Sequence, residues 1–192
     1  MLTSVQECVE FIENYLRRFE RPIMGKLQLG VPDQVVQDAF NAVHLSAPSG
    51  LIALYSCHDG TRIKKGDSLD DAHYFPGFYW LSLSDAFNTY RAFFADPRWN
   101  KSWVPIFGNG GGDFFAVVCE ENSTNFGSVV GFRVGQLEQP IQFENILSMM
   151  QSVSRCYELG LYFLDNGYLE ADDFKAAMVA KALNPNLSYY KD

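Results

Sequence analysis

The stretch Trp103-Val-Pro-Ile-Phe-Gly-Asn-Gly-Gly-Gly-Asp-Phe-Phe-Ala-Val-Val-Cys119 joins an aromatic arm, a glycine-rich turn and an apolar segment. Its last six residues, 114–119, are all apolar. The segment is too short for an ordinary helix and rich in aromatic and β-branched side chains, so a β-strand is predicted. Because polar residues do not alternate with the apolar ones, we expect this strand to be covered on both faces. The glycines before it can adopt positive φ angles, which allows a sharp turn into the strand.

The glycine run lacks the pattern of a phosphate-binding loop. A P-loop requires Lys followed by Ser or Thr after its last glycine, whereas Asp113 and Phe114 follow here. A dinucleotide-binding turn has glycine at its sixth position and opens a helix, but the sixth residue counted from Gly108 is Asp113 and a strand follows. A carboxylate at this place would also repel a phosphate. No nucleotide site is therefore predicted.

Residues 103–107, the Gly-Gly-Asp at 111–113 and the following strand resemble the central signature of the SUKH superfamily. These are the bacterial immunity proteins related to the fungal cell-wall-assembly regulators. Residues 47–60 resemble the family's Leu-Pro helix that ends in Asn-Gly, and residues 80–86 resemble its short strand that leads into a helix. The resemblance covers about residues 30–165.

The chain departs from the family pattern at three places. It has Ala47 where Leu is usual, Asp59 where Asn is usual, and Cys119-Glu-Glu121 where the strand often ends in an Asp-containing segment. The motifs are therefore degenerate, although they occur in the expected order.

The resemblance implies an α+β fold with a mixed, largely antiparallel central sheet flanked by helices. We expect a single SUKH-like domain over residues 1–192, since a chain of 192 residues suits one domain. Residues 1–30 would be an N-terminal helical lead-in and residues 165–192 a C-terminal helical extension. The resemblance also implies a non-enzymatic protein that binds other proteins, most bacterial members neutralising a toxin made by the same or a neighbouring cell.

Charge and hydropathy restrict the partners and the location. The net charge of −8 disfavours nucleic acid and favours a basic partner. The first twenty residues lack the basic-then-apolar pattern of a signal peptide, and no run approaches the ~18 apolar residues of a membrane span. A cytoplasmic protein without a membrane partner is therefore expected. The oligomeric state is not indicated.

Cysteines and histidines show no metal-binding spacing. The four cysteines form no Cys-x-x-Cys pair, which favours buried thiols in a reducing compartment over disulfide or metal roles. His44 and His58 fall near predicted helix ends. His73 with Asp70 is a candidate metal or proton-transfer pair, but a third ligand and a nucleophile are missing. No metal or cofactor is predicted.

Residues 164–178 contain a cluster of carboxylates, as a calcium-binding loop does. Their spacing does not match that of an EF-hand, so the acidic first turn of a terminal helix is predicted instead.

Hydrophobic periodicity and capping residues predict the remaining elements. The predicted helices cover residues 4–20, 32–44, 46–60, 84–94, 143–159 and about 170–183; the predicted strands cover 78–83, 114–119 and 127–134; and a surface loop covers 61–77.

The proposed partner surface consists of acidic side chains, which would meet the basic groove of a nuclease-like toxin and speed association, and of aromatic anchors, which would supply affinity. For most of the acidic residues an ordinary solvated surface is the alternative, and for the pair Trp99 and Trp103 the alternative is that at least one of them packs in the core. The candidates are Asp59, Asp67, Asp70, Asp71, Asp113, Glu120 and Glu121, with Trp80 and Trp99 as the anchors.

Two other functions remain open. The eukaryotic relatives imply a regulatory or scaffold protein. A small hydrolase is less favoured because the chain has no Gly-x-Ser-x-Gly elbow and no His-Glu-x-x-His helix. A pocket that joins His73, Asp113 and a cysteine would favour the hydrolase.

Overall fold

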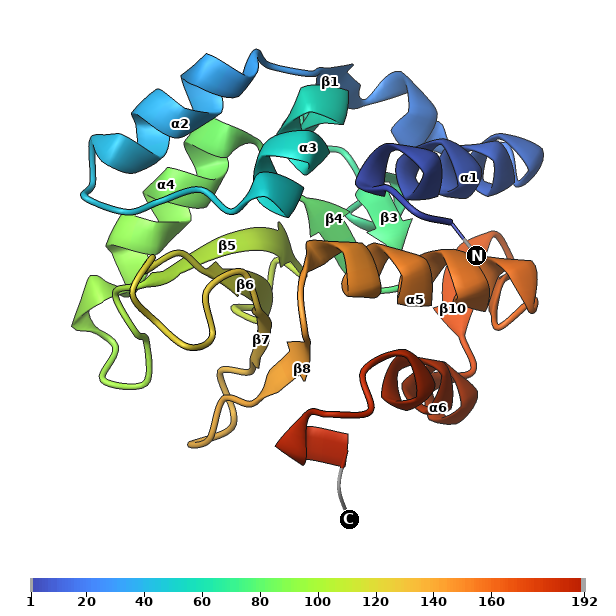
Figure 1. Cartoon of the computed structure of the whole chain (residues 1–192). Helices are drawn as coiled ribbons and strands as arrows, with labels where there is room; N and C mark the ends of the chain where they lie inside the picture. Colours follow the sequence, from blue (N-terminus) through green and yellow to red (C-terminus); the bar gives the residue numbers. More distant parts are fainter. Residues whose placement is uncertain (1, 191–192) are drawn as a thin grey trace.

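A six-stranded antiparallel sheet lies at the centre of the computed structural model, which describes residues 2–190 (Figure 1). Its strands lie in sequence order and each neighbouring pair is antiparallel. The expected α+β fold with a largely antiparallel sheet is confirmed. Residues 1, 191 and 192 of the expected domain lie outside the described part. The strands are β3 (His73–Phe75), β4 (Phe78–Trp80), β5 (Trp103–Gly108), β6 (Phe114–Val118), β7 (Val129–Phe132) and β8 (Ile141–Phe143).

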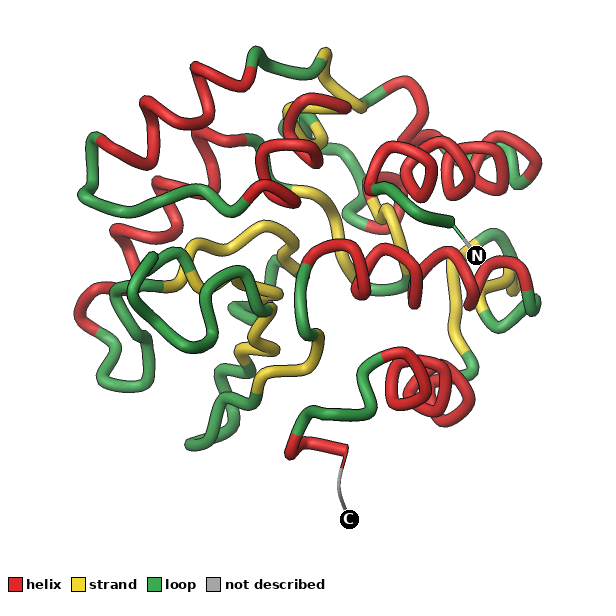
Figure 2. Tube along the Cα trace, viewed as in Figure 1, coloured by secondary structure: helices red, strands yellow, loops and turns green. Residues whose placement is uncertain are grey.

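Helices surround this sheet (Figure 2). In Figure 1, α5 runs across the front, with α1 above it and α6 below it, and α5 contacts both. Within residues 2–190, no helix is both long and apolar enough to cross a membrane. The α-helices are α1 (Val5–Arg18), α2 (Asp33–Asn41), α3 (Ser49–Cys57), α4 (Leu83–Ala92), α5 (Ile146–Glu158) and α6 (Asp173–Leu183).

Shorter elements complete the fold. Within residues 2–190, two small antiparallel sheets lie beside the helices, and short 3₁₀ helices occupy three connections and the segment after α6. The strands of the small sheets are β1 (Leu27–Leu29) with β2 (His58–Thr61), and β9 (Tyr162–Asp165) with β10 (Tyr168–Ala171). The 3₁₀ helices are η1 (Pro22–Gly25), η2 (Asp70–Ala72), η3 (Phe93–Ala95) and η4 (Ser188–Tyr190).

The central strand β6 is covered on both faces, as its sequence predicts. All five of its residues are buried. Successive side chains of a strand point to opposite faces, and here they enter different aromatic groups. The ring centre of Phe114 lies 5.0 Å from that of Phe93, whereas that of Phe115 lies 4.7 Å from that of Phe78 and 5.8 Å from that of Phe143. Both layers of the core therefore depend on this strand.

The glycine-rich segment before β6 forms the predicted sharp turn. Gly110 and Gly112 have φ angles of 77° and 99°. The Asn109 side-chain oxygen accepts hydrogen bonds from the backbone N–H groups of Gly111 and Asp113, at 2.7 and 3.0 Å. The turn is thus closed by its own side chains.

Several predicted boundaries are wrong. The strand predicted for residues 78–83 ends at Trp80, because the Ser82 side chain caps α4, which already begins at Leu83. The helix predicted for residues 46–60 ends at Cys57, because His58 already pairs with Leu29 in a two-stranded sheet. The polar segment 61–77, predicted as a surface loop, contains η2 and β3 because Tyr74 and Phe75 enter the core.

The terminal region also differs from the prediction. Residues 162–171 form a β-hairpin that the sequence reading missed. Asn166 and Gly167 form its turn with φ angles of 49° and 88°, which is the behaviour of an Asn-Gly hairpin turn. The acidic start of α6 is confirmed in part: Asp172 caps the helix and Asp173 begins it, whereas Glu170, predicted in its first turn, lies in β10.

Gly60 provides a test of the packing between β2 and the start of α4. Its φ is 67°, and a Cβ atom would lie 2.4 Å from the Leu81 carbonyl carbon and the Ser82 nitrogen. We expect Gly60→Ala to lower the free energy of unfolding by about 2 kcal/mol or more, since positive φ and the clash both act. Urea unfolding measures the change. Gly25→Ala is the control because no atom lies within 4 Å of its Cβ position; equal stability of the two variants would contradict this description.

Candidate functional site

The two tryptophan anchors are not available to a partner. Trp80 is fully buried and Trp99 is 6% exposed. The Trp80 ring centre lies 5.4 Å from that of Tyr74 and 5.8 Å from that of Phe107. The prediction that both are exposed anchors is wrong, because their large apolar rings fill the two layers of the core.

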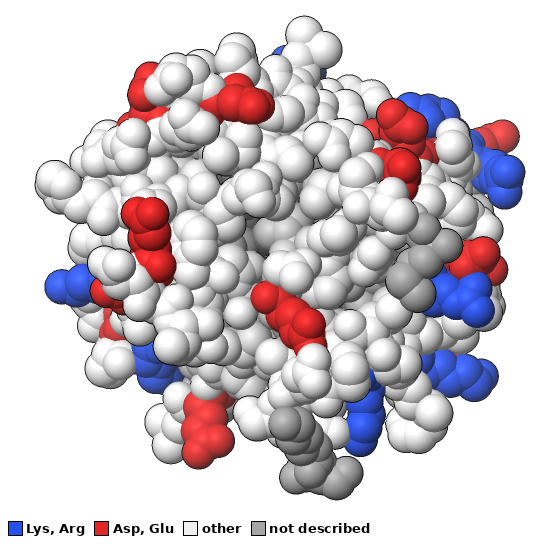
Figure 3. Space-filling model, viewed as in Figure 1, with Lys and Arg blue, Asp and Glu red and all other residues white. Residues whose placement is uncertain are grey.

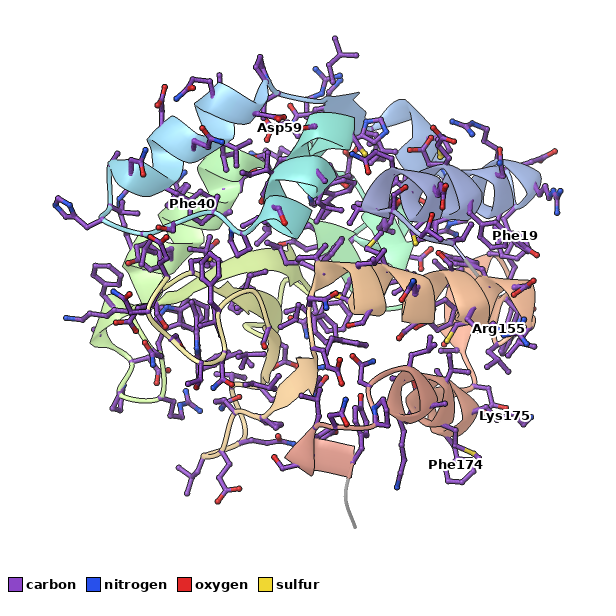
Figure 4. The ribbon with its side chains drawn as sticks, viewed as in Figure 1. Phe19, Phe40, Asp59, Arg155, Phe174 and Lys175 are labelled. Atoms are coloured by element: carbon purple, nitrogen blue, oxygen red, sulfur yellow. The ribbon has the colours of Figure 1, made fainter. Side chains whose placement is uncertain are left out.

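Three of the acidic candidates form hydrogen bonds or an ion pair within the protein and so stabilise its fold. An Asp59 carboxylate oxygen accepts the backbone N–H of Leu83 at 2.7 Å, at the start of α4, and Asp59 lies beside α3 (Figure 4). Asp113 accepts the backbone N–H of Val134 at 2.9 Å and so ties the glycine-rich turn to the end of β7. Asp67 forms an ion pair of 2.7 Å with Lys26. These carboxylates are already engaged within the fold.

Asp70 is the most deeply engaged of the acidic candidates. It pairs with Arg21 at 2.6 Å, and the Arg21 side chain is only 3% exposed. Arg21 also donates to the carbonyl oxygen of Gly167, and the other Asp70 oxygen accepts the backbone N–H of Leu169 at 3.2 Å. This pair therefore connects η2 with the chain after α1 and with the β9–β10 hairpin.

Asp71 provides a matched comparison for Asp70. Its side chain forms no hydrogen bond or ion pair with another residue of the described chain. We expect Asp70→Ala to cost about 3 kcal/mol of unfolding free energy, because it leaves a buried guanidinium without its carboxylate. Asp71→Ala should change stability by less than about 0.5 kcal/mol. Denaturant unfolding of both variants decides the matter, and equal losses would show that Asp70 has no special structural role.

The remaining acidic candidates, Glu120 and Glu121, are exposed at the start of the connection between β6 and β7. We call residues 119–128 the β6–β7 loop. Backbone hydrogen bonds fix this loop, including Ser123 to Glu120 at 2.9 Å and Phe126 to Ser123 at 3.1 Å. Phe126 is 36% exposed on it. The loop is thus an ordered surface that carries two carboxylates and an aromatic ring.

The β6–β7 loop lies against the segment that joins α2 to α3. The backbone N–H of Ser46 donates to the Cys119 carbonyl at 2.9 Å, and its hydroxyl donates to Glu121 at 3.2 Å. Acidic side chains are spread over the face in Figure 3 rather than gathered, and several basic ones lie along its right edge. Of the nine candidates, only Glu120 and Glu121 lie next to each other as exposed carboxylates, and Glu121 also accepts the Ser46 hydroxyl.

A buried acid–base pair that sequence reasoning missed joins α1 to β2. Glu13 is 7% exposed, and its carboxylate lies 2.7 Å from Nε2 of His58, while Nδ1 of His58 lies 2.9 Å from the Gln28 carbonyl oxygen. Both partners are acceptors, so only the doubly protonated imidazolium satisfies both. The residues are 45 positions apart, and no sequence signal connects them.

The same contacts shift both pKa values. The hydrogen bond to Glu13 raises the pKa of His58 above its ordinary value of 6.5, against the effect of burial. Burial acts to raise the pKa of Glu13, but the hydrogen bond and charge of His58, together with Arg17, outweigh it, and the pKa falls below 4.5. The His58 contribution is complete below its unfolded pKa and is lost as pH rises through the raised folded value. The Glu13 contribution is present above its unfolded pKa and is lost as pH falls through the lowered folded value.

These signs predict a stability difference that depends on pH. The wild type should exceed His58→Gln in unfolding free energy by about 1.5 kcal/mol near pH 5.5, and the difference should shrink toward pH 8. Urea unfolding across this range measures it. His44→Asn is the control, since His44 is exposed and Asn tolerates its φ of 59°. A difference that grows above pH 7 would refute the assignment.

The groups that would favour a hydrolase are not brought together within residues 2–190. Among residues 2–190 no group of three or more His, Cys, Asp or Glu side chains is arranged to hold a metal ion. His73 lies 3.4 Å from Asp70, which is itself paired with Arg21. Asp113 instead contacts Val134 and Asn109, and neither His73 nor Asp113 lines the cavity between the sheet and α6 or the one between α1, α5 and α6.

The cysteines are poorly suited to nucleophilic chemistry. All four are free thiols, and three are buried as predicted, with Cys57 partly exposed. Burial raises the pKa of Cys57 and of Cys156 to about 11, and it also raises that of Cys119. The reactive thiolate is therefore scarce at neutral pH.

The fold and the site together define the class of protein: an α+β domain with a buried central strand and an ordered polar loop on its surface. The family model that matches the chain is that of the SMI1 / KNR4 family (SUKH-1), over residues 30–152. The chain belongs to this family, and the resemblance of its three motifs is thereby confirmed. Domains of this family generally bind proteins and are not enzymes. A comparison with curated proteins gives no match.

Proposed function

We propose that this protein is a cytoplasmic immunity protein that neutralises a toxin by binding it. The observation that carries the proposal is membership of the SUKH-1 family over residues 30–152. The lack of a metal cluster within residues 2–190 and the raised pKa values of the thiols agree with a binding role.

We place the toxin-binding surface on the β6–β7 loop. Its two carboxylates are exposed, whereas Asp59, Asp67, Asp70 and Asp113 already serve the fold. The loop begins directly after the central strand, so the rigid sheet fixes its position. Ordered loops on a rigid scaffold lose little conformational entropy on binding, which favours affinity.

The proposed mechanism combines steering with a local anchor. Glu120 and Glu121, added to a net charge of −8, attract a basic toxin domain and raise the association rate. Phe126 replaces the buried tryptophans as the aromatic contact of this surface. The toxin is inactivated because its basic, substrate-binding groove is covered.

Affinity capture tests the function. Tagged protein is used to capture partners from a lysate of its own organism, with any large secreted protein encoded next to it included, and mass spectrometry identifies the bound chains. Capture of a toxin domain whose activity is lost on binding supports the proposal. Capture of housekeeping proteins alone would favour the regulatory or scaffold role, and no partner together with a stoichiometric bound metal would favour an enzyme.

Charge reversal tests the surface. Glu120→Lys with Glu121→Lys should lower the association rate with the captured toxin about tenfold at low salt and flatten its salt dependence, because steering is electrostatic. Stopped-flow or surface-binding kinetics measure the rate. Glu138→Lys with Glu170→Lys is the control, since both residues are exposed and the change in net charge is the same. Equal slowing by both pairs would locate the effect in net charge and not in the loop.

A further inference from the structure

Arg133 is a partly buried cation without a carboxylate partner in the described chain. It follows β7, and its guanidinium carbon lies 5.3 Å from the ring centre of Phe78 and 5.0 Å from that of Phe115. Its Nη1 donates to the carbonyl oxygens of Phe132 and Phe114, at 3.0 and 3.4 Å. No Asp or Glu oxygen of residues 2–190 lies within ion-pair distance of it.

Arg98 shows how the same fold treats a comparable side chain. Its guanidinium also lies over an aromatic ring, 5.6 Å from the centre of Phe132, but it pairs with Asp96 at 2.6 Å. Arg133 has no such partner within residues 2–190, although burial lowers its pKa, with Asp113 acting in the opposite direction from a longer distance. A guanidinium that is partly removed from water is stabilised by an anion, so the absence of a carboxylate partner among the described residues is the notable feature.

Arg133 lines a cavity of about 370 Å³ between the sheet and the C-terminal part of the chain. Phe78, Phe115 and Phe143 form its wall on the sheet side, and the small side chains of Ala176 and Ala180 face it from α6. This volume suits a small organic molecule. Asp173 is the one carboxylate among the lining residues and is exposed at the start of α6, so a second negative charge on a ligand would be disfavoured.

Gln142 is a second polar residue at the same cavity, and Gly131 leaves room for its side chain. A Cβ atom on Gly131 would lie 2.4 Å from the side-chain amide of Gln142, so Gly131 leaves room for this amide over β7. Gln142 lines the cavity, and its side-chain amide makes no hydrogen bond with another described residue. Nη2 and Nε of Arg133 likewise have no hydrogen-bond acceptor within residues 2–190.

We propose that this cavity binds a small organic monocarboxylate with an aromatic or branched apolar body. The carboxylate accepts hydrogen bonds from the Arg133 guanidinium and the Gln142 amide, and the apolar body lies on the phenylalanine wall. The site lies away from the β6–β7 loop in sequence and includes α6, which is outside the family match. Ligand binding would therefore tie the C-terminal part to the family domain, independently of any toxin.

The test titrates the purified full chain with phenylacetate, 3-phenylpropionate, benzoate and isovalerate, each compared with its uncharged amide. Amide-proton NMR shifts and calorimetry report binding up to about 10 mM. We expect at least one acid to bind at least tenfold more tightly than its amide, with the largest shifts at residues 131–133 and 142. Failure of every acid, or equal binding of acids and amides, would overturn the proposal.

Variants assign the carboxylate to its donors. Arg133→Gln should weaken binding at least tenfold, Arg133→Lys should weaken it less, and Gln142→Ala about threefold, because the guanidinium supplies two parallel donors. Arg91→Gln is the control, since Arg91 is exposed on α4 and does not line the cavity, and it should leave affinity within twofold. Since Gln142 is partly exposed, its variant retains the test if Arg133→Gln fails to fold. Unchanged affinity in both Arg133→Lys and Gln142→Ala would contradict the assigned contacts.

Discussion

The complete burial of β6 is the constraint on which the rest of this protein depends. A strand with apolar side chains on both faces must be covered on both faces, since each Å² of apolar surface left in water costs about 25 cal/mol of folding free energy. Here Phe114 and Phe115 enter separate aromatic groups on the two faces. This requirement explains the arrangement of the surrounding elements, which are the helices, the glycine-rich turn and the aromatic segment 93–99.

This constraint places the residues that identify the family in the core, away from the surface on which we propose that a partner binds. The Trp-Val-Pro-Ile-Phe arm, the Gly-Gly-Asp turn and the strand of the central signature lie in the core or close it. They explain why the chain folds as a SUKH domain, and most of their strand side chains are buried and so cannot reach a partner. The proposed partner surface therefore lies on a connection between strands, the β6–β7 loop, which is ordered and exposes two carboxylates.

Sequence reasoning succeeded where periodicity or continuous burial decides the structure. The stripe of apolar residues in α1, the methionine-containing face of α5 and the strand β6 all follow from local patterns. It failed for β3, because a strand of only three residues lies inside a polar segment. It also missed the hairpin turn at Asn166 and Gly167, because the nearby carboxylates resemble those of a calcium-binding loop and the Asn-Gly turn signal was overlooked.

The candidate site was harder to predict, for a physical reason. A carboxylate has the same sequence signal whether it faces solvent or pairs inside the fold. Asp70 is tied to Arg21 across 49 positions, and Glu13 to His58 across 45, so neither engagement is visible in a local pattern. Only the folded chain distinguishes these structural acids from Glu120 and Glu121.

Amide hydrogen exchange, with and without the captured toxin, tests the central claim most directly. The account predicts that amides of β5, β6 and β7 exchange slowest in the free protein, and that the toxin slows exchange in residues 120–127 without affecting residues 67–71. Fast exchange in β6 of the free protein, or toxin protection confined to residues 67–71, would contradict it.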